Sequence, residues 1–243
     1  LIPITNTFKE NLASMTRIWL HWASRDHDAM LSQSGLSIVS PAIEGTTATG
    51  QIIGSMSGLT YKRLPWTMRR TYAIPYEAMT IADYEDRYFV AARMALERDI
   101  SVMATPNPTT LIRLASVAQS RAEEILRAMH DGTLGLTSTK LHGENAAEQK
   151  ELYQNLAKRL KPNPKRAKEL ERRCAASGQL LPRFAWPDIQ IIGCWLGGSC
   201  GVHANRLKEL YGPNVALRDL GLRASEATMT IPFEDDNPAG VLA

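Results

Sequence analysis

The stretch RASEA, residues 223–227, places a glutamate directly after a short apolar run. A carboxylate at the end of a buried strand can hold Mg²⁺, which takes oxygen ligands and bridges phosphates. Two other roles fit the same residues: Glu226 can cap a helix together with Ser225, or it can form a salt bridge with Arg223. The residues alone leave these three interpretations open.

A second stretch, LGGSCG at 196–201, lies between an expected strand and an expected helix. Glycines there allow the backbone to approach a ligand, and the start of a helix favours an anion. A tight turn that binds nothing fits the same letters equally well. His203, just after this loop, has the environment of a packed helix residue rather than that of a catalytic base.

GTTATGQ, residues 45–51, is also rich in the small residues that can surround a phosphate with backbone N–H groups. No lysine ends the loop, however, and the residues that follow favour a strand rather than a helix. We therefore interpret 45–51 as a hairpin loop. No serine, cysteine or lysine lies beside a histidine in a known nucleophile pattern, and the histidines fit no common metal motif.

Composition indicates a globular protein of 243 residues, with 44% hydrophobic and 22% charged residues. No apolar run is long enough to suggest a membrane span, so we expect no membrane partner. Three cysteines without a CxxC pair favour a reducing compartment, and we predict a cytoplasmic location. The net charge of +3 is concentrated in 158–173, where eight Lys and Arg accompany two Glu. No aromatic residue is interspersed there, which favours a solvated basic helix over a nucleic-acid surface.

Periodicity predicts an alternation of helices and strands. A helix is expected at 7–25, with Thr7 and Glu10 as a capping box, and short strands and loops at 35–61. The remaining expected elements are a helix at 85–99, a strand at 100–105, a helix at 106–132, a polar surface segment at 137–157, a basic helix from 163, a strand at 188–196, a helix at 202–212 and a strand at 215–222.

This alternation predicts an α/β fold with a mostly parallel or mixed sheet flanked by helices. Ligands of such sheets bind where strands end at their carboxyl side. Three segments are therefore candidates for a site: 104–108, 197–201 and 223–228. No fixed repeat and no low-complexity linker divides the chain, so we expect one α/β domain over 1–243.

Five motifs, in order along the chain, resemble the Gretchen Hagen family, the auxin-responsive acyl-acid amido synthetases among the adenylate-forming enzymes. They are LIPIT (1–5), VMATPNPTTLIRLA (102–115), EILRAMHDGTLG (124–135), WPDIQIIGCWLGGSC (186–200) and LRASEA (222–227). The first is similar to the end of the family's phosphate-loop segment, and the last to its YxASE nucleotide motif. The resemblance implies the large N-terminal domain of such an enzyme. The upstream phosphate loop and the C-terminal lid domain are expected to lie outside these 243 residues.

The resemblance implies ATP and Mg²⁺ as cofactors, with Glu226 as the catalytic carboxylate facing the phosphates and the metal, and Ser225 positioning it. It places six residues at the nucleotide: Gly197, Gly198, Ser199, Leu222, Arg223 and Ala224. It places four on the acyl-pocket wall: Met103, Ala104, Thr105 and Leu111. Met103 could equally be a core residue, since its pattern fits both roles.

Two departures from the family pattern concern the nucleotide motif. Leu222 stands where the family has a tyrosine that stacks on adenine, and Arg223 is unusual. The implied activity is ATP-dependent adenylation of a small hydrophobic carboxylic acid, followed by acyl transfer to an amine such as an amino acid. The loss of the aromatic residue keeps an alternative open, a catalytically silent relative that binds a ligand or a partner.

Overall fold

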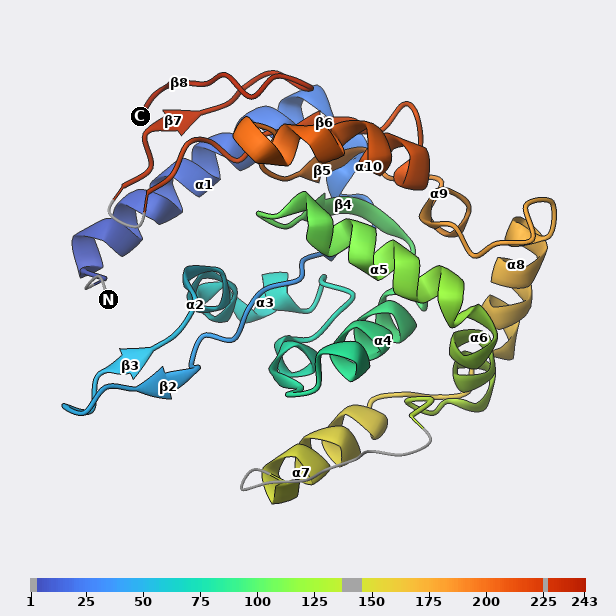
Figure 1. Cartoon of the computed structure of the whole chain (residues 1–243). Coiled ribbons are helices and arrows are strands. Elements are labelled where there is room, and N and C mark those ends of the chain that lie inside the picture. The colour runs from blue at the N-terminus through green and yellow to red at the C-terminus, as the bar shows by residue number, and fades with distance from the viewer. Residues whose placement is uncertain (1–3, 137–145, 225–226) are drawn as a thin grey trace.

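Four parallel strands form the central sheet of the computed structural model, which describes residues 4–136, 146–224 and 227–243 (Figure 1). Its order is β1 (Ser34–Leu36), β4 (Ile100–Ala104), β5 (Ile191–Gly193) and β6 (Ala216–Arg218), and all three pairings are parallel. The prediction of an α/β fold with a mostly parallel sheet flanked by helices is confirmed.

The other elements are helices, short 3₁₀ turns and two small hairpins. The helices are α1 (Asn6–Asp26), α2 (Met56–Arg63), α3 (Trp66–Arg69), α4 (Tyr84–Ala95), α5 (Pro108–Ser120), α6 (Ala122–Asp131), α7 (Ala146–Ala157), α8 (Pro164–Cys174), α9 (Pro182–Ala185) and α10 (Ala204–Tyr211). The 3₁₀ turns are η1 (Asp28–Leu31), η2 (Tyr76–Thr80) and η3 (Gly198–His203), and the hairpins are β2 (Gly45–Thr46) with β3 (Ile52–Ile53) and β7 (Thr230–Ile231) with β8 (Val241–Leu242). No helix in the described ranges is long and apolar enough to cross a membrane.

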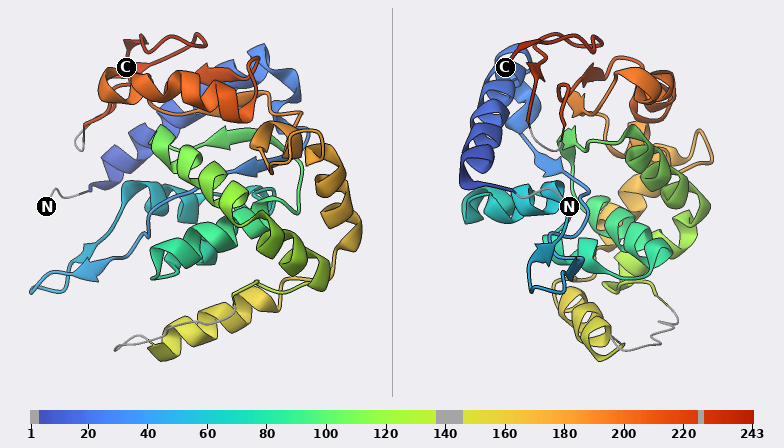
Figure 2. Two further views of the ribbon diagram at one scale, coloured as in Figure 1. Left: turned by 45° about the vertical axis from the view of Figure 1, so that its right-hand side comes forward. Right: turned by 60° about the vertical axis from the view of Figure 1, so that its left-hand side comes forward.

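Helices cover both faces of the sheet (Figure 2). α1 lies on one face, where Trp19 packs in a cluster with Ile191 of β5. α4, α5 and α10 lie on the other, where Ile192 belongs to the main core. Adjacent residues of β5 thus point to opposite faces, as the period of two in a strand requires, and both faces are buried. This double burial explains the continuous apolar runs of β4 and β5.

Most predicted elements are confirmed, most of them with shorter boundaries, whereas α1 is slightly longer than predicted. The predicted helix at 106–132 is two helices, because the backbone of Arg121 (φ −120°, ψ 28°) leaves the helical region between α5 and α6. Its predicted start and stop are correct: Asn107 Oδ1 accepts the Thr109 N–H at 3.0 Å, and Gly132 ends α6 with a φ of 72°. The cap of α1 is Thr5 rather than Thr7, since Thr5 Oγ1 accepts the Phe8 N–H at 3.1 Å.

The segment predicted as strands and loops, 35–61, contains helix α2. The hairpin prediction for 45–51 is confirmed by the antiparallel pairing of β2 and β3. α2 was missed because the glycines in and just before it suggested loops, whereas they serve close packing. A Cβ on Gly58 would lie 2.3 Å from the Ser40 carbonyl oxygen, and one on Gly54 would lie 1.9 Å from that of Ala42. Glycine therefore lets α2 approach the chain that leaves β1.

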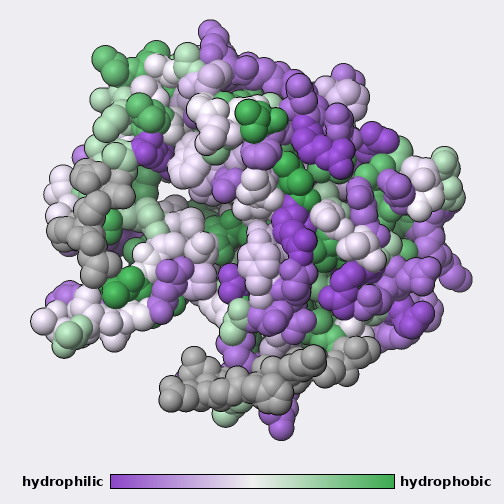
Figure 3. All heavy atoms as spheres, in the orientation of Figure 1, coloured by the Kyte–Doolittle hydropathy of each residue, from purple (hydrophilic) through white to green (hydrophobic). Residues whose placement is uncertain are grey.

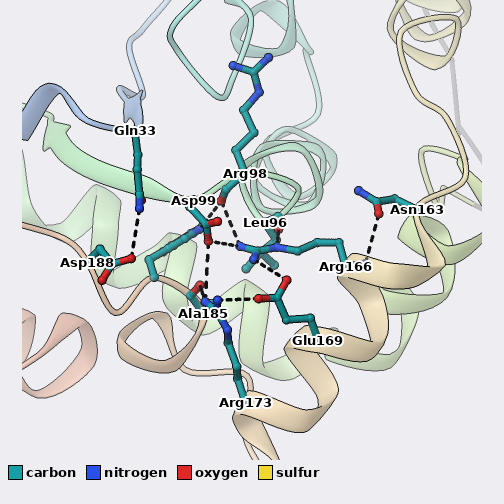
Figure 4. Close-up of polar contacts among 11 residues, drawn as sticks. Gln33, Leu96, Arg98, Asp99, Asn163, Arg166, Glu169, Arg173, Ala185 and Asp188 are labelled. Carbon is teal, nitrogen blue, oxygen red and sulfur yellow. Dashed lines mark hydrogen bonds and ion pairs between the residues drawn. The ribbon is translucent and has the colours of Figure 1, made fainter.

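The basic helix α8 is held by ion pairs (Figure 4). Arg166 Nη2 lies 2.8 Å from Asp99 Oδ1, and Glu169 contacts both Arg166 at 3.0 Å and Arg173 at 2.5 Å. Arg166 Nε also donates to the Leu96 carbonyl oxygen at 3.0 Å. The predicted apolar seam of Ala167, Leu170 and Cys174 is buried. Part of the local positive charge is thus used to attach α8 to the segment that enters β4.

A buried arginine links α1 to the end of the sheet. The Arg218 side chain is 1% exposed, and its Nη2 lies 3.0 Å from Asp26 and 2.8 Å from Asp235. His27 Nε2 contacts the same Asp235 carboxylate at 2.8 Å. These contacts fix the C-terminal end of α1 and the segment around Asp235 against β6. Because α1 is one continuous helix, its start is thereby positioned relative to the sheet as well.

Candidate functional site

A cleft of about 1370 Å³ opens at the carboxyl edge of the parallel sheet. Every strand of that sheet leads into it. The lining residues that follow the strands are Ile38 and Ser40 after β1, Thr105, Pro106 and Asn107 after β4, Trp195 after β5, and Arg223 and Ala224 after β6. Figure 3 shows this face hollowed between the upper body of the molecule and the β2–β3 hairpin at lower left. The cleft occupies the position where parallel α/β sheets bind their ligands.

The remaining walls come from elements outside the sheet. The β2–β3 hairpin and the first half of α2 form one wall. The start of α1 contributes Phe8 and Lys9, and Ile4 precedes the helix. Apolar side chains gather on the hairpin and α2: Ile52, Ile53, Met56 and Leu59. The cleft therefore offers an apolar surface beside the polar strand ends, an arrangement that suits a ligand with an apolar tail and a polar head.

The charged side chains of the cleft, within the described part of the chain, are Lys9 and Arg223, and no described carboxylate lines it. Burial lowers the pKa of Arg223, although the nearby Asp219 opposes this effect. The Arg223 Nε atom is buried and has no hydrogen-bond partner among the described residues. A partly buried guanidinium is costly unless an anion satisfies it. These features suit a negatively charged ligand.

Asp219, which the sequence analysis did not single out, joins the glycine loop to the segment that leaves β6. Its Oδ2 accepts the N–H groups of Leu196 at 2.5 Å and Gly197 at 3.3 Å, and its Oδ1 accepts that of Gly221 at 2.6 Å. The Trp19 indole donates to the Asp219 carbonyl oxygen at 2.8 Å. Asp219 thus holds three segments in register beside the cleft. The sequence signal for this role was an acidic residue two positions before a glycine at the end of a strand. Surface loops carry the same pattern, so the signal did not single out Asp219.

Replacing Asp219 with Ala should lower the free energy of unfolding by about 2 kcal/mol, because it leaves N–H groups of Leu196 and Gly221 without their charged acceptor. Denaturant unfolding of the variant measures this loss. Asp131→Ala is the control, since the Asp131 side chain is 53% exposed and its ion pair within the described part of the chain is with the neighbouring His130. Equal stability of the two variants would show that Asp219 does not hold the loop.

The residues predicted to bind the nucleotide lie at the carboxyl edge of the sheet, as expected, but not all of them line the cleft. The glycine loop forms the 3₁₀ turn η3, and Gly197, Gly198 and Ser199 are exposed beside the cleft rather than among its lining residues. Leu222 is 62% exposed and does not line it either, whereas Arg223 and Ala224 do. Ser225 and Glu226 lie outside the described residues.

The four predicted acyl-pocket residues divide in the same way. Thr105 lines the cleft, and its hydroxyl donates to the Asn107 carbonyl oxygen at 3.1 Å. Met103 and Leu111 are fully buried in the main core, and Ala104 is partly buried in β4 without lining the cleft. The structure therefore favours the core role that the sequence left open for Met103. The apolar lining comes instead from the hairpin and α2, in the segment that the sequence analysis predicted as short strands and loops.

Comparisons with known proteins agree with this architecture. Residues 1–216 match the family model described as the GH3 family N-terminal domain. A solved structure described as "GH3.15 acyl acid amido synthetase" superposes with a TM-score of 0.71 at 18% identity, covering 96% of this chain and 41% of that one. Another, described as "AtGH3.15 acyl acid amido synthetase in complex with 2,4-DB", gives 0.69 at 19% identity, with 96% and 40% covered. No curated protein matches.

The two structures show the fold, and this chain spans about two fifths of their length. The strength of the assignment comes from the family model, which covers nearly all of the 243 residues, including β1, β4 and β5 and the first residue of β6. The resemblance carried by the five sequence motifs is confirmed: the chain belongs to the GH3 family.

Proposed function

We propose that the protein containing this chain is an acyl-acid amido synthetase, which uses ATP to activate a small carboxylic acid with an apolar tail and then transfers the acyl group to an amine such as an amino acid. The observation that carries this proposal is the cleft at the sheet edge, which combines an apolar wall with two cationic side chains and no described carboxylate. The names of the two similar structures support the reaction class, and the complex with 2,4-DB supports a carboxylic acid as substrate.

The proposed reaction has two steps. In the first, a carboxylate oxygen of the acid attacks the α-phosphorus of ATP, the bond from that phosphorus to the bridging oxygen breaks, and pyrophosphate leaves. In the second, the amine attacks the acyl carbon, loses a proton, and AMP leaves. Neither step needs a nucleophile from the protein, so its contribution is to position the anions and to neutralise the developing charge.

The described residues fit the phosphates better than they fit the metal. Lys9 lies in the first turns of α1, near its positive N-terminal end, and Arg223 enters the cleft from the sheet. No cluster of three metal-ligating side chains occurs in the described ranges. Mg²⁺ usually takes only one or two carboxylates and completes its shell with phosphate oxygens and water. Glu226 would be that carboxylate, and the bound ion would neutralise the departing pyrophosphate.

In this arrangement the apolar tail of the acid lies against Ile53, Met56 and Leu59, and its carboxylate points toward the strand ends. Thr105 and Arg223 are the side chains available there to orient it. A wall of this kind selects for tail size and apolarity rather than for one acid.

ATP–pyrophosphate exchange on the intact protein tests the proposal. Exchange should require a carboxylic acid and should be faster with apolar-tailed acids than with acetate. Arg223→Gln should slow it about tenfold or more, because a hydrogen bond to a charged group contributes about 1.5–3 kcal/mol. The matched control is Arg206→Gln, which removes an exposed guanidinium of α10 that is paired with Glu209 and does not line the cleft.

Exchange without any added acid, or an unchanged rate in Arg223→Gln, would contradict the proposed roles. A third outcome would show that the protein is the catalytically silent relative. In that case calorimetry detects binding of an apolar acid to the intact protein, but no acid supports exchange. The exposed Leu222 in place of the family's tyrosine is the feature that would then explain the loss of activity.

A further inference from the structure

A second cavity, of about 530 Å³, shares no lining residue with the cleft. Its wall contains the last turn of α2, helix α3 and the segment that enters η2, and it is completed by residues of α4 and the chain after α7. We call it the basic pocket, because five cationic side chains line it. They are Lys62, Arg69, Arg70, Arg98 and Arg159.

Only two carboxylates line the basic pocket in the described part of the chain, and both are already paired. Glu77 contacts Arg159 at 3.0 Å, and Glu97 contacts Arg93 at 2.8 Å. Arg93 is fully buried behind the wall and is not a lining residue. The pocket therefore has three more positive than negative charges, and confining like charges in a small space is unfavourable unless an anion joins them.

The cationic side chains of the basic pocket that have no carboxylate partner there are held by aromatic rings and carbonyl groups. The Arg70 guanidinium stacks on Trp66, with 4.6 Å to the ring centroid, and the Lys62 ammonium lies 5.2 Å from the Tyr76 ring. Arg98 Nη1 donates to the Arg70 carbonyl oxygen at 3.2 Å. Contacts of this kind orient a cation and leave its charge and most of its donors available.

We propose that the basic pocket binds a phosphate-bearing small molecule, at a site separate from the cleft. Guanidinium groups present two parallel donors that match phosphate oxygens, and three arginines beside a lysine suit more than one phosphate. The volume lies in the range of small-molecule sites, and the lining comes from several separate elements rather than from one flat surface. Trp66, which is 61% exposed, offers an aromatic face for a ring on the ligand.

The basic pocket and the cleft share structural supports. α2 contributes Met56, Ser57 and Leu59 to the cleft, and Tyr61 and Lys62 to the basic pocket. The Tyr76 hydroxyl, on the wall of the pocket, accepts the N–H of Ala42, which lines the cleft, at 2.7 Å. A ligand in the basic pocket therefore contacts the same helix and the same tyrosine that support the apolar wall of the cleft.

Inorganic tripolyphosphate, added to the intact protein without divalent metal, is the probe. Calorimetry should detect binding, and the tryptophan fluorescence should change with the same midpoint. Trp66→Phe should abolish this change, which separates it from any signal of Trp195 in the cleft. Arg70→Gln and Arg98→Gln should each weaken this binding at least about tenfold. The matched control is Arg63→Gln, which removes the same charge from α2 at a residue that does not line the pocket.

Lys9→Gln separates the two sites, because Lys9 lines only the cleft. The proposal predicts that this variant keeps the binding step whose fluorescence change depends on Trp66, even if a second step at the cleft is lost. Binding weakened equally by Arg63→Gln and Arg70→Gln would show unspecific attraction and overturn the proposal. Binding lost in Lys9→Gln alone, or no binding by the unaltered protein, would overturn it as well. Thermal midpoints of all variants show whether each one is folded.

Discussion

Glu226→Gln should slow adenylation by the intact protein about 100- to 1000-fold, which is the usual effect of removing one electrostatic contact to a developing charge. The substitution keeps the size of the side chain and removes its charge. In the described part of the cleft the charged side chains are cationic, so a carboxylate from 225–226 would be the missing partner for Mg²⁺. The fold should be almost unaffected. Pyrophosphate release and the thermal midpoint are measured side by side on this variant.

The two other roles for Glu226 predict different results. A salt bridge with Arg223 predicts a loss of about 1 kcal/mol or less in stability and near-normal adenylation. A helix cap shared with Ser225 predicts that Ser225→Ala costs about 1 kcal/mol of stability without an effect on chemistry. Glu234→Gln, at an exposed carboxylate of the C-terminal segment, is the control for simple loss of charge. A destabilised but active Glu226→Gln enzyme would assign this glutamate a structural role.

The sheet could be predicted because both of its faces are buried. Strands covered on two sides are continuous apolar runs, and ISVMA and the residues around β5 stand out against the polar helices between them. Helix ends marked by local chemistry were also predictable, as at Asn107 and Gly132. α2 was not, because Gly58 within it and Gly54 just before it are explained only by the backbone of 40–42 packed against them. That contact is tertiary and leaves no periodic signal.

The sequence predicted which edge of the sheet holds the site, but not every residue that lines it. The rule on carboxyl ends identified the segments 104–108 and 223–228, which contain the lining residues Thr105, Arg223 and Ala224. Its third segment, 197–201, contributes no lining residue. It could not identify Lys9 or the apolar wall, because α1 and the hairpin reach the cleft through packing rather than through strand order. Asp219 was equally hidden, since its three N–H partners come from two loops that meet only in the folded chain.

The prediction for Met103 shows why register matters. Neighbouring residues of a strand point to opposite faces, so a shift of one position exchanges a core residue for one on the other face. In β4, Val102 packs on the α1 side, whereas Met103 enters the main core. Because both faces of β4 are apolar, the sequence of the strand does not reveal its register. The cleft begins only where the strand has ended, at Thr105.

Met103→Ala should therefore destabilise the protein by about 2–5 kcal/mol, the usual effect of a cavity left in a packed core, and should leave the preference among acids unchanged. Ile53→Ala is the matched variant: Ile53 is half-buried on the cleft wall, so its truncation should cost less stability and shift preference toward acids with bulkier tails. Denaturant unfolding and exchange rates over a panel of acids measure both effects. A stable Met103→Ala variant with altered acid preference would place Met103 on the acyl pocket after all, and would show that the apolar tail lies deeper, under the sheet edge, than the cleft walls imply.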